Sequence, residues 1–268
     1  MREPFSPYKS LINHRVIASK IPYTDKENQL TTYTNNVTMD NGWCWEIPLW
    51  DGLSVGYVHS LQFTTKEKIR QEFSDRYGDI PTKEIQFRTG RRLRAWVGNV
   101  VSVGLSYGFI EPLEATGLAS IVTNIFRLLE VVSRGMKFNS LDRQSYNTSC
   151  EDSLDNSKTF IDMHYAASHK DDTEYWRHVT NEIEYDWNSH SNGRTIDLLC
   201  KDRNFSNKEL NGGLPFILVG SGYGQYSNAF TRSLADKGYY GPIKDEWVSK
   251  DRQLTEQVLQ CRTPTQFL

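Results

Sequence analysis

The chain has 268 residues, enough for one large domain or two small ones. Lys and Arg number 31 against 33 Asp and Glu, and the net charge of -2 excludes a protein that binds nucleic acid or anionic lipid through general charge attraction. The 7 Trp, 14 Tyr and 12 Phe side chains supply large rings to bury, which excludes disorder over most of the chain.

The N-terminal residues lack the apolar core of a secretory signal, and no stretch reaches the roughly 20 apolar residues of a membrane span. We therefore expect a cytoplasmic protein that does not associate with a membrane. The cysteines stand far apart without a C-x-x-C pair, a spacing that predicts free thiols in the cytoplasm. They are Cys44, Cys150, Cys200 and Cys261.

The first forty residues are polar and predict strands and loops. Residues 43–49 alternate buried-type and variable side chains, which indicates a strand that ends near Pro48. Residues 53–58 predict its antiparallel partner, with a turn at Asp51 and Gly52 between them.

Residues 63–77 predict a surface helix, because their few apolar side chains are spaced i,i+4. Residues 85–103 predict two more strands around Gly90, the second spanning residues 96–103. A dense basic run lies here and has two interpretations, a phosphate-binding patch or the solvated face of a strand. The net charge favours the solvated face. The run consists of Arg88, Arg91, Arg92 and Arg94.

Residues 104–117 form a glycine-punctuated loop that leads into a helix. Apolar residues of this helix recur at i, i+3, i+4 and i+7, which is typical of a helix packed on a sheet, and Gly135 predicts its end. The apolar stripe consists of Leu118, Ile121, Val122, Ile125, Leu128, Leu129 and Val132.

A strand, a glycine-rich loop and a helix N-terminus can bind an anion, because free N–H groups and the positive end of the helix dipole point to one spot. Thr116 and Gly117 lie in the first turn and predict a nest for a phosphate or a halide. Glu114 precedes them, so the carboxylate and the anion must act on different partners. The alternative, which spacing alone favours, is that Glu114 and Thr116 only cap the helix.

Beyond residue 137 the chain becomes rich in Asn, Ser and Asp and then helical and aromatic. We therefore expect two parts, residues 1–138 and residues 139–268. The loop at residues 220–224 has Gln225 where a dinucleotide fingerprint needs its third glycine, so we do not expect phosphate binding there. Histidines of the second part lack metal-ligand spacing, which predicts no metal site. They are His164, His169, His178 and His190.

Four segments of the chain resemble motifs of the flavin-dependent tryptophan halogenases. Residues 43–48, W-C-W-E-I-P, resemble the W-x-W-x-I-P motif, and residues 56–60, G-Y-V-H-S, resemble a G-Y-V-Y-S strand. The R-A-W-V-G-N segment starting at Arg94 and the F-I-E-P-L-E-A-T-G segment starting at Phe109 resemble R-A-W-x-x-N and F-V-E-P-L-E-S-T-G. Ala115 stands where that family usually has serine.

The resemblance implies an FAD monooxygenase-type enzyme in which reduced FAD, oxygen and a halide ion produce hypohalous acid for an aromatic or indole substrate. Glu114 matches the catalytic glutamate that faces the substrate ring, where it would act as a general base. The other matched positions have binding roles. They are Thr116 and Gly117 for the halide, Leu105 and Leu118 for the flavin, and Trp43, Trp45, Ile47 and Pro48 along the halide and substrate tunnel.

The implied fold is α+β, the FAD-monooxygenase-like portion of an α/β protein, with a mixed or antiparallel sheet, a packed helix and a mostly helical substrate cap. The family's dinucleotide loop and catalytic lysine belong to an N-terminal half that precedes everything matched here. Two hypotheses follow. The chain is either the C-terminal portion of a halogenase that works with a separately encoded N-terminal half, or a catalytically incomplete remnant that binds an aromatic ligand or a partner. The expected partners are an aromatic small molecule and a flavin reductase, and a homodimer is a candidate assembly.

Overall fold

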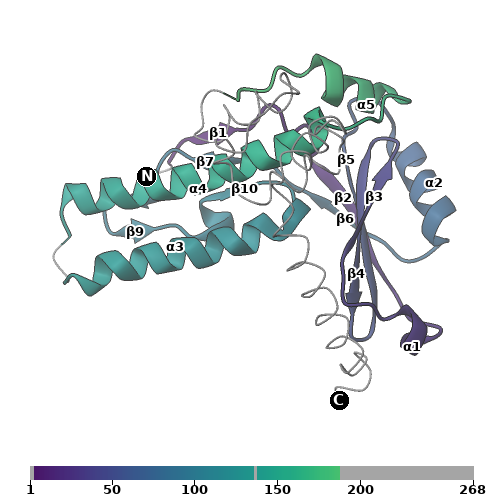
Figure 1. Ribbon diagram of the computed structural model, residues 1–268, viewed down its shortest axis with the longest axis horizontal. Helices are drawn as coiled ribbons and strands as arrows, with labels where there is room; N and C mark the ends of the chain where they lie inside the picture. Colours follow the sequence, from purple (N-terminus) through teal and green to yellow (C-terminus); the bar gives the residue numbers. More distant parts are fainter. Residues whose placement is uncertain (1–2, 136–137, 188–268) are drawn as a thin grey trace, which may run out of the picture.

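The computed structural model describes residues 3–135 and 138–187, in which the two longest helices, residues 116–133 and 140–166, lie beside a twisted antiparallel sheet (Figure 1). In chain order the elements are β1 (Phe5–Pro7), β2 (Arg15–Ile21), α1 (Lys26–Gln29), β3 (Asn35–Met39), β4 (Gly42–Leu49), β5 (Gly52–His59), α2 (Lys66–Tyr77), β6 (Lys83–Gln86), β7 (Gly90–Arg92), β8 (Trp96–Val97), β9 (Val100–Val101), η1 (Gly104–Ser106), β10 (Gly108–Phe109), η2 (Leu113–Ala115), α3 (Thr116–Ser133), α4 (Ser140–Ala166), α5 (Glu174–Arg177) and η3 (His178–Glu182).

The largest sheet has the strand order β3-β4-β5-β2-β6, with every neighbouring pair antiparallel. Strands β4 and β5 form the predicted hairpin, and Trp45 lies opposite Gly56. A Cβ atom at Gly56 would lie 2.1 Å from the indole ring of Trp45, so the glycine leaves the space that this ring occupies. The two strands predicted around the turn are thus confirmed.

Strand β4 contributes to two separate cores, because successive side chains of a strand point to opposite faces of the sheet. Cys44 packs with Ile69 and Phe73 of α2, whereas Trp43 packs in the core that α4 also enters. Helix α2 accordingly lies across the sheet from α3 and α4 (Figure 1). It confirms the predicted surface helix but begins at Lys66, where Thr65 caps it, rather than at residue 63.

The strand predicted over residues 96–103 is wrong in its extent. The chain instead forms the two-residue strands β8 and β9, which pair with each other antiparallel. Gly98 has a φ of 60° and turns the chain between them. Strand β7, which contains Gly90, pairs with β1 and β10 in a separate sheet.

Helix α3 forms where it was predicted, but the expectation that its apolar stripe packs on a sheet is wrong. Its inner face is largely polar and its apolar face is exposed. The buried residues are Thr116, Ser120, Asn124 and Val131. The exposed apolar residues are Leu118, Val122, Ile125, Phe126 and Leu129. Periodicity identifies an apolar face of a helix, not what covers it.

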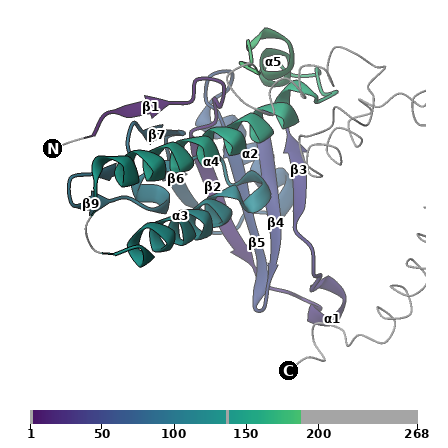
Figure 2. The same cartoon turned by 60° about the vertical axis from the view of Figure 1, so that its left-hand side comes forward.

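Within the described residues, Leu113–Ser133 is the one helical stretch long and apolar enough to cross a membrane by length and composition. The expectation that no stretch reaches this length is therefore wrong. The core helix of a soluble protein passes the same test, so this single helix is weak evidence for a membrane span. Helix α3 runs along α4 in both views (Figures 1 and 2), with its polar face turned inward.

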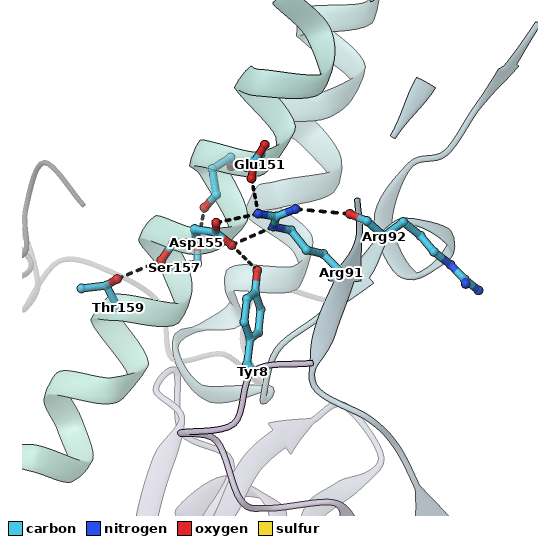
Figure 3. Close-up of polar contacts among 8 residues, drawn as sticks. Tyr8, Arg91, Arg92, Glu151, Asp155, Ser157 and Thr159 are labelled. Carbon is cyan, nitrogen blue, oxygen red and sulfur yellow. Dashed lines mark hydrogen bonds and ion pairs between the residues drawn. The ribbon is translucent and has the colours of Figure 1, made fainter. Parts of the chain in front are cut away.

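Arg91 on β7 is an anchor for α4 and not part of a solvated strand face, so that prediction is wrong for this residue. Its Nε lies 2.9 Å from Oδ1 of Asp155, its Nη2 lies 3.0 Å from Oδ2, and Glu151 forms a further ion pair with it. The Tyr8 hydroxyl donates to the same Asp155 carboxylate at 2.5 Å (Figure 3). Charge pairing therefore joins β7, the N-terminal segment and α4.

Antiparallel sheets combined with helices confirm the α+β class of fold. Cys44 and Cys150 are buried free thiols, as predicted. Cys200, Cys261, His190 and the loop at residues 220–224 lie outside the described residues. The division at residue 138 stays a prediction, and the part of the cap beyond residue 187 also lies outside the described residues.

Candidate active site

The loop between β10 and α3 holds two consecutive residues in the left-handed region of backbone conformation. Glu114 has φ 62° and ψ 18°, and Ala115 has φ 50° and ψ 22°. Such conformations cost a non-glycine residue about 1–3 kcal/mol each and are concentrated at functional sites. The loop therefore depends on surrounding contacts to hold its shape.

The N-terminus of α3 carries no side-chain cap, so the capping alternative is not realised. Ala115 occupies the N-cap position, and its methyl group cannot accept a hydrogen bond. The hydroxyl of Thr116 donates back to the carbonyl of Leu113 at 3.3 Å, and a Cβ added at Gly117 would meet open space. The first N–H groups of the helix are thus left to a ligand or to water, as an anion site requires.

The side chain of Glu114 is held by His164 of α4. Oε1 of Glu114 lies 3.2 Å from Nε2 of His164, and the carboxylate is 41% exposed while the imidazole is 11% exposed. This hydrogen bond is the largest influence on the pKa of Glu114 and lowers it below its ordinary value, against a smaller opposing effect of burial. Glu114 is therefore an ionised carboxylate at neutral pH.

Both ring nitrogens of His164 have a partner in this structure. Nδ1 lies 2.8 Å from the carbonyl oxygen of Phe160, one turn earlier in α4. Because Nδ1 meets this backbone carbonyl, Nε2 is the nitrogen that faces Glu114. The contact with Phe160 therefore orients the imidazole ring toward the carboxylate.

The four residues of the predicted tunnel motif lie along β4. Trp43 is buried, and its ring meets that of Trp45 edge to face with centroids 6.3 Å apart. Both side chains pack with the core on the face of the sheet toward α4. Ile47 is exposed and Pro48 is half-buried. The motif thus runs from the core outward to an exposed rim.

The two predicted flavin contacts lie on the outside of the described chain. Leu105 is 77% exposed and Leu118 is 70% exposed. Both belong to one region, because η1, which holds Leu105, packs against α3 closely enough that a Cβ at Gly104 would meet the Ile121 side chain at 2.7 Å. An exposed apolar pair beside an uncapped helix N-terminus fits a cofactor such as FAD, which combines a flat aromatic ring system with an anionic pyrophosphate.

Two groups in and around the site were missed by sequence reasoning. His164 was weighed only as a metal ligand, although it contacts Glu114 across 50 residues of sequence. Glu111 was quoted only as part of a motif, yet it is 1% exposed and contacts three other side chains. Within residues 3–135 and 138–187 no group of three or more His, Cys, Asp or Glu side chains is placed to hold a metal.

Comparison with known proteins places the chain in a family. The family model described as tryptophan halogenase matches residues 1–208. Tryptophan 7-halogenase KtzQ of Kutzneria sp. (strain 744) is 34% identical over 182 residues, which are 66% of this chain and 34% of that protein. Among solved structures, VirX1 is 32% identical with a TM-score of 0.80, over 97% of this chain and 53% of that one. A thermophilic tryptophan halogenase from Streptomycin violaceusniger is 28% identical with a TM-score of 0.76, over 95% and 51%.

The fold and the comparisons therefore define a protein of the flavin-dependent halogenase type, and the chain belongs to the tryptophan halogenase family. It spans about a third of the length of the curated relatives it matches and about half of the length of the solved chains.

Proposed function

We propose that this chain supplies the substrate-side portion of a flavin-dependent halogenase, which halogenates an aromatic or indole ring with reduced flavin, oxygen and a halide. One observation carries the proposal. The Glu114 carboxylate lies in left-handed backbone directly before an uncapped helix N-terminus and is held there by His164. Family membership supports the same reaction class.

Glu114 is the proposed general base. Replacing a ring hydrogen by a halogen cation leaves a positively charged ring that must lose its proton, and an ionised carboxylate within reach accepts it. The lowered pKa keeps Glu114 ionised at neutral pH, and its partial exposure leaves an oxygen for the ring. His164 would orient the carboxylate.

The cofactor and halide assignments follow from position along the loop. The backbone N–H groups of Thr116 and Gly117 would hold the halide, and Leu105 and Leu118 would contact the flavin. Reduced FAD, when bound, supplies with oxygen the oxidising power that converts a halide into an electrophile. The segment from Trp43 to Pro48 would line the route of that electrophile and exclude substrate from the flavin side.

The exposed face of α3 is the proposed docking surface for the flavin-binding portion of a halogenase, on the same chain or separately encoded. Helix α3 buries polar residues and exposes Leu118, Ile125 and Phe126. Exposure of these apolar side chains to water is unfavourable unless another surface covers them. The face is continuous with the proposed flavin contact at Leu118. A flavin reductase as supplier of reduced FAD, a homodimer and a cytoplasmic location complete the proposal.

The test of the catalytic role combines this chain with a flavin-binding N-terminal portion taken from a related flavin-dependent halogenase and measures halogenation of an indole. Glu114→Gln is expected to lower turnover by about 10²- to 10⁴-fold, the usual contribution of a general base. Flavin binding, followed by fluorescence quenching, should remain at the level of the unchanged chain. Equal turnover of the two proteins would refute the role of Glu114.

The test of the docking surface measures binding of the same two portions with Phe126→Asp on α3. A charge in a buried apolar interface is expected to weaken binding by about 10-fold or more. Tyr33→Asp, which alters an equally exposed aromatic residue distant from α3, is the matched control and should bind normally. Absence of flavin binding even with the second portion present would favour the alternative of a catalytically incomplete remnant.

A further inference from the structure

Two glutamates three residues apart, Glu111 and Glu114, are held by two consecutive residues of α4. Tyr165 donates its hydroxyl hydrogen to Glu111, and His164 contacts Glu114. We propose that Glu111 is a positioning residue, whose buried hydrogen bonds hold the loop so that Glu114 meets His164. The proposal rests on the proposed function only for the meaning of Glu114, because the positioning itself is a property of the folded chain.

The carboxylate of Glu111 is a meeting point of three segments distant in sequence. Its Oε2 accepts a hydrogen bond from Nδ2 of Asn13 at 3.1 Å, one from Nε1 of Trp43 at 3.1 Å and one from the hydroxyl of Tyr165. These donors come from the segment before β2, from β4 and from α4. One buried oxygen therefore ties the loop to the sheet and to a helix at once.

A second layer of contacts fixes the donors themselves. Nδ2 of Asn13 also donates to the Tyr165 hydroxyl at 2.9 Å, and the hydroxyl of the fully buried Tyr175 donates to Oδ1 of Asn13 at 3.2 Å. Because Asn13 and Tyr165 are each hydrogen-bonded to another member, neither can turn away without breaking a second buried bond. The network is thus able to hold Glu111 in one place.

The link from Glu111 to Glu114 is short and stiff. Pro112 has its φ restricted by its ring, and Leu113 is buried. Beyond them lie the two left-handed residues, and the hydroxyl of Thr116 closes the far side of the loop on the carbonyl of Leu113. A loop in such a conformation is retained only when its surroundings determine it, and Glu111 is its buried anchor.

The three donors need an acceptor oxygen, and this requirement separates the candidate variants. Glu111→Gln keeps a carbonyl oxygen for them, with its amide group at the place of Oε1, which has no hydrogen-bond partner among the described residues. Glu111→Leu removes the acceptor and breaks three buried hydrogen bonds at once. Tyr165→Phe removes a single donor and keeps the ring.

The experiment is NMR of the imidazole nitrogens of His164 in the full chain, assigned with a His164→Gln variant. Glu114→Gln gives the reference spectrum of a His164 that has lost its carboxylate partner. We expect Glu111→Leu to move the His164 signals at least halfway to that reference and Tyr165→Phe to move them less in the same direction. Glu111→Gln should restore the signals of the unchanged chain.

Tyr107→Phe is the matched control for Tyr165→Phe, because Tyr107 is buried like Tyr165 but its hydroxyl has no hydrogen-bond partner among the described residues. It should leave the His164 signals in place. Near-ultraviolet circular dichroism establishes that each variant is folded. If Glu111→Leu does not fold, Tyr165→Phe decides alone, and unchanged His164 signals in the folded variants would overturn the proposal. The readout needs no halogenation, so it can succeed even where the proposed function fails.

Discussion

Helices α3 and α4 lie side by side, yet each packs in the opposite way from what its composition suggests (Figure 2). The apolar α3 exposes most of its apolar residues and buries mainly polar ones. The polar α4, rich in Asn, Ser and Asp, buries side chains along its whole length. They include Tyr146, Cys150, Leu154, Ile161, Met163 and Tyr165.

The difference shows that α4 is buried by other parts of the described chain, whereas the described residues leave the apolar face of α3 uncovered. A helix with all its packing partners present turns its apolar stripe inward, because burial of apolar area is the main favourable term in folding. Helix α4 obeys this rule within the described residues. Helix α3 obeys it when another surface covers its outer face, the role proposed above for the flavin-binding portion.

The largest expected effect contrasts one isoleucine on each helix. Ile161 of α4 is fully buried, and Ile161→Ala should lower the free energy of unfolding by about 2–5 kcal/mol through lost burial and a cavity. Ile125 of α3 is 44% exposed, and Ile125→Ala should change it by no more than about 0.5 kcal/mol. Urea denaturation of the chain alone measures both. Equal losses would show that α3 is already covered within this chain.

A smaller effect is expected from the ion pair that fixes α4 to β7. Arg91→Met removes the cation between Glu151 and Asp155 and leaves their charges uncompensated. Because both carboxylates are about a third or more exposed, we expect the free energy of unfolding to fall by about 1–3 kcal/mol, less than for a fully buried pair. Urea denaturation measures this loss, and Arg94→Met, at a pair with Glu3 whose arginine is 54% exposed, is the control that should cost less.

Sequence patterns predicted the elements of the fold better than their packing. The β4–β5 hairpin and helices α2 and α3 follow from local periodicity and turn residues, which act over a few positions. The burial of Arg91 and the outward stripe of α3 depend on partners far away in the chain or outside it, which periodicity does not encode. The strand predicted at residues 96–103 failed because Gly98 turns the backbone.

The candidate site shows the same limit. Glu114, Thr116 and Gly117 were identified because they are adjacent in one motif. His164 and Glu111 were missed as site residues, since their roles arise from contacts across 50 and up to 98 positions of sequence. One local signal pointed to Glu111. It is an acidic residue among buried-type neighbours, and such a residue needs a polar partner once it is buried.

The smallest expected effect concerns the pKa of Glu114, and its direction follows from the contact with His164. His164 lowers the pKa of Glu114, so His164→Phe, which keeps a ring against Phe160, should raise that pKa toward its ordinary value. A ¹³C titration of the Glu114 carboxyl in the chain measures the change directly. Because the ionised form is the base, the acidic limb of the pH profile of halogenation by the assembled enzyme should move to higher pH.

His178→Phe is the control, because it alters another histidine–glutamate pair, with Glu182, and should leave the Glu114 titration unchanged. A Glu114 titration that stays the same in His164→Phe would mean that α4 contributes packing but no charge to the site.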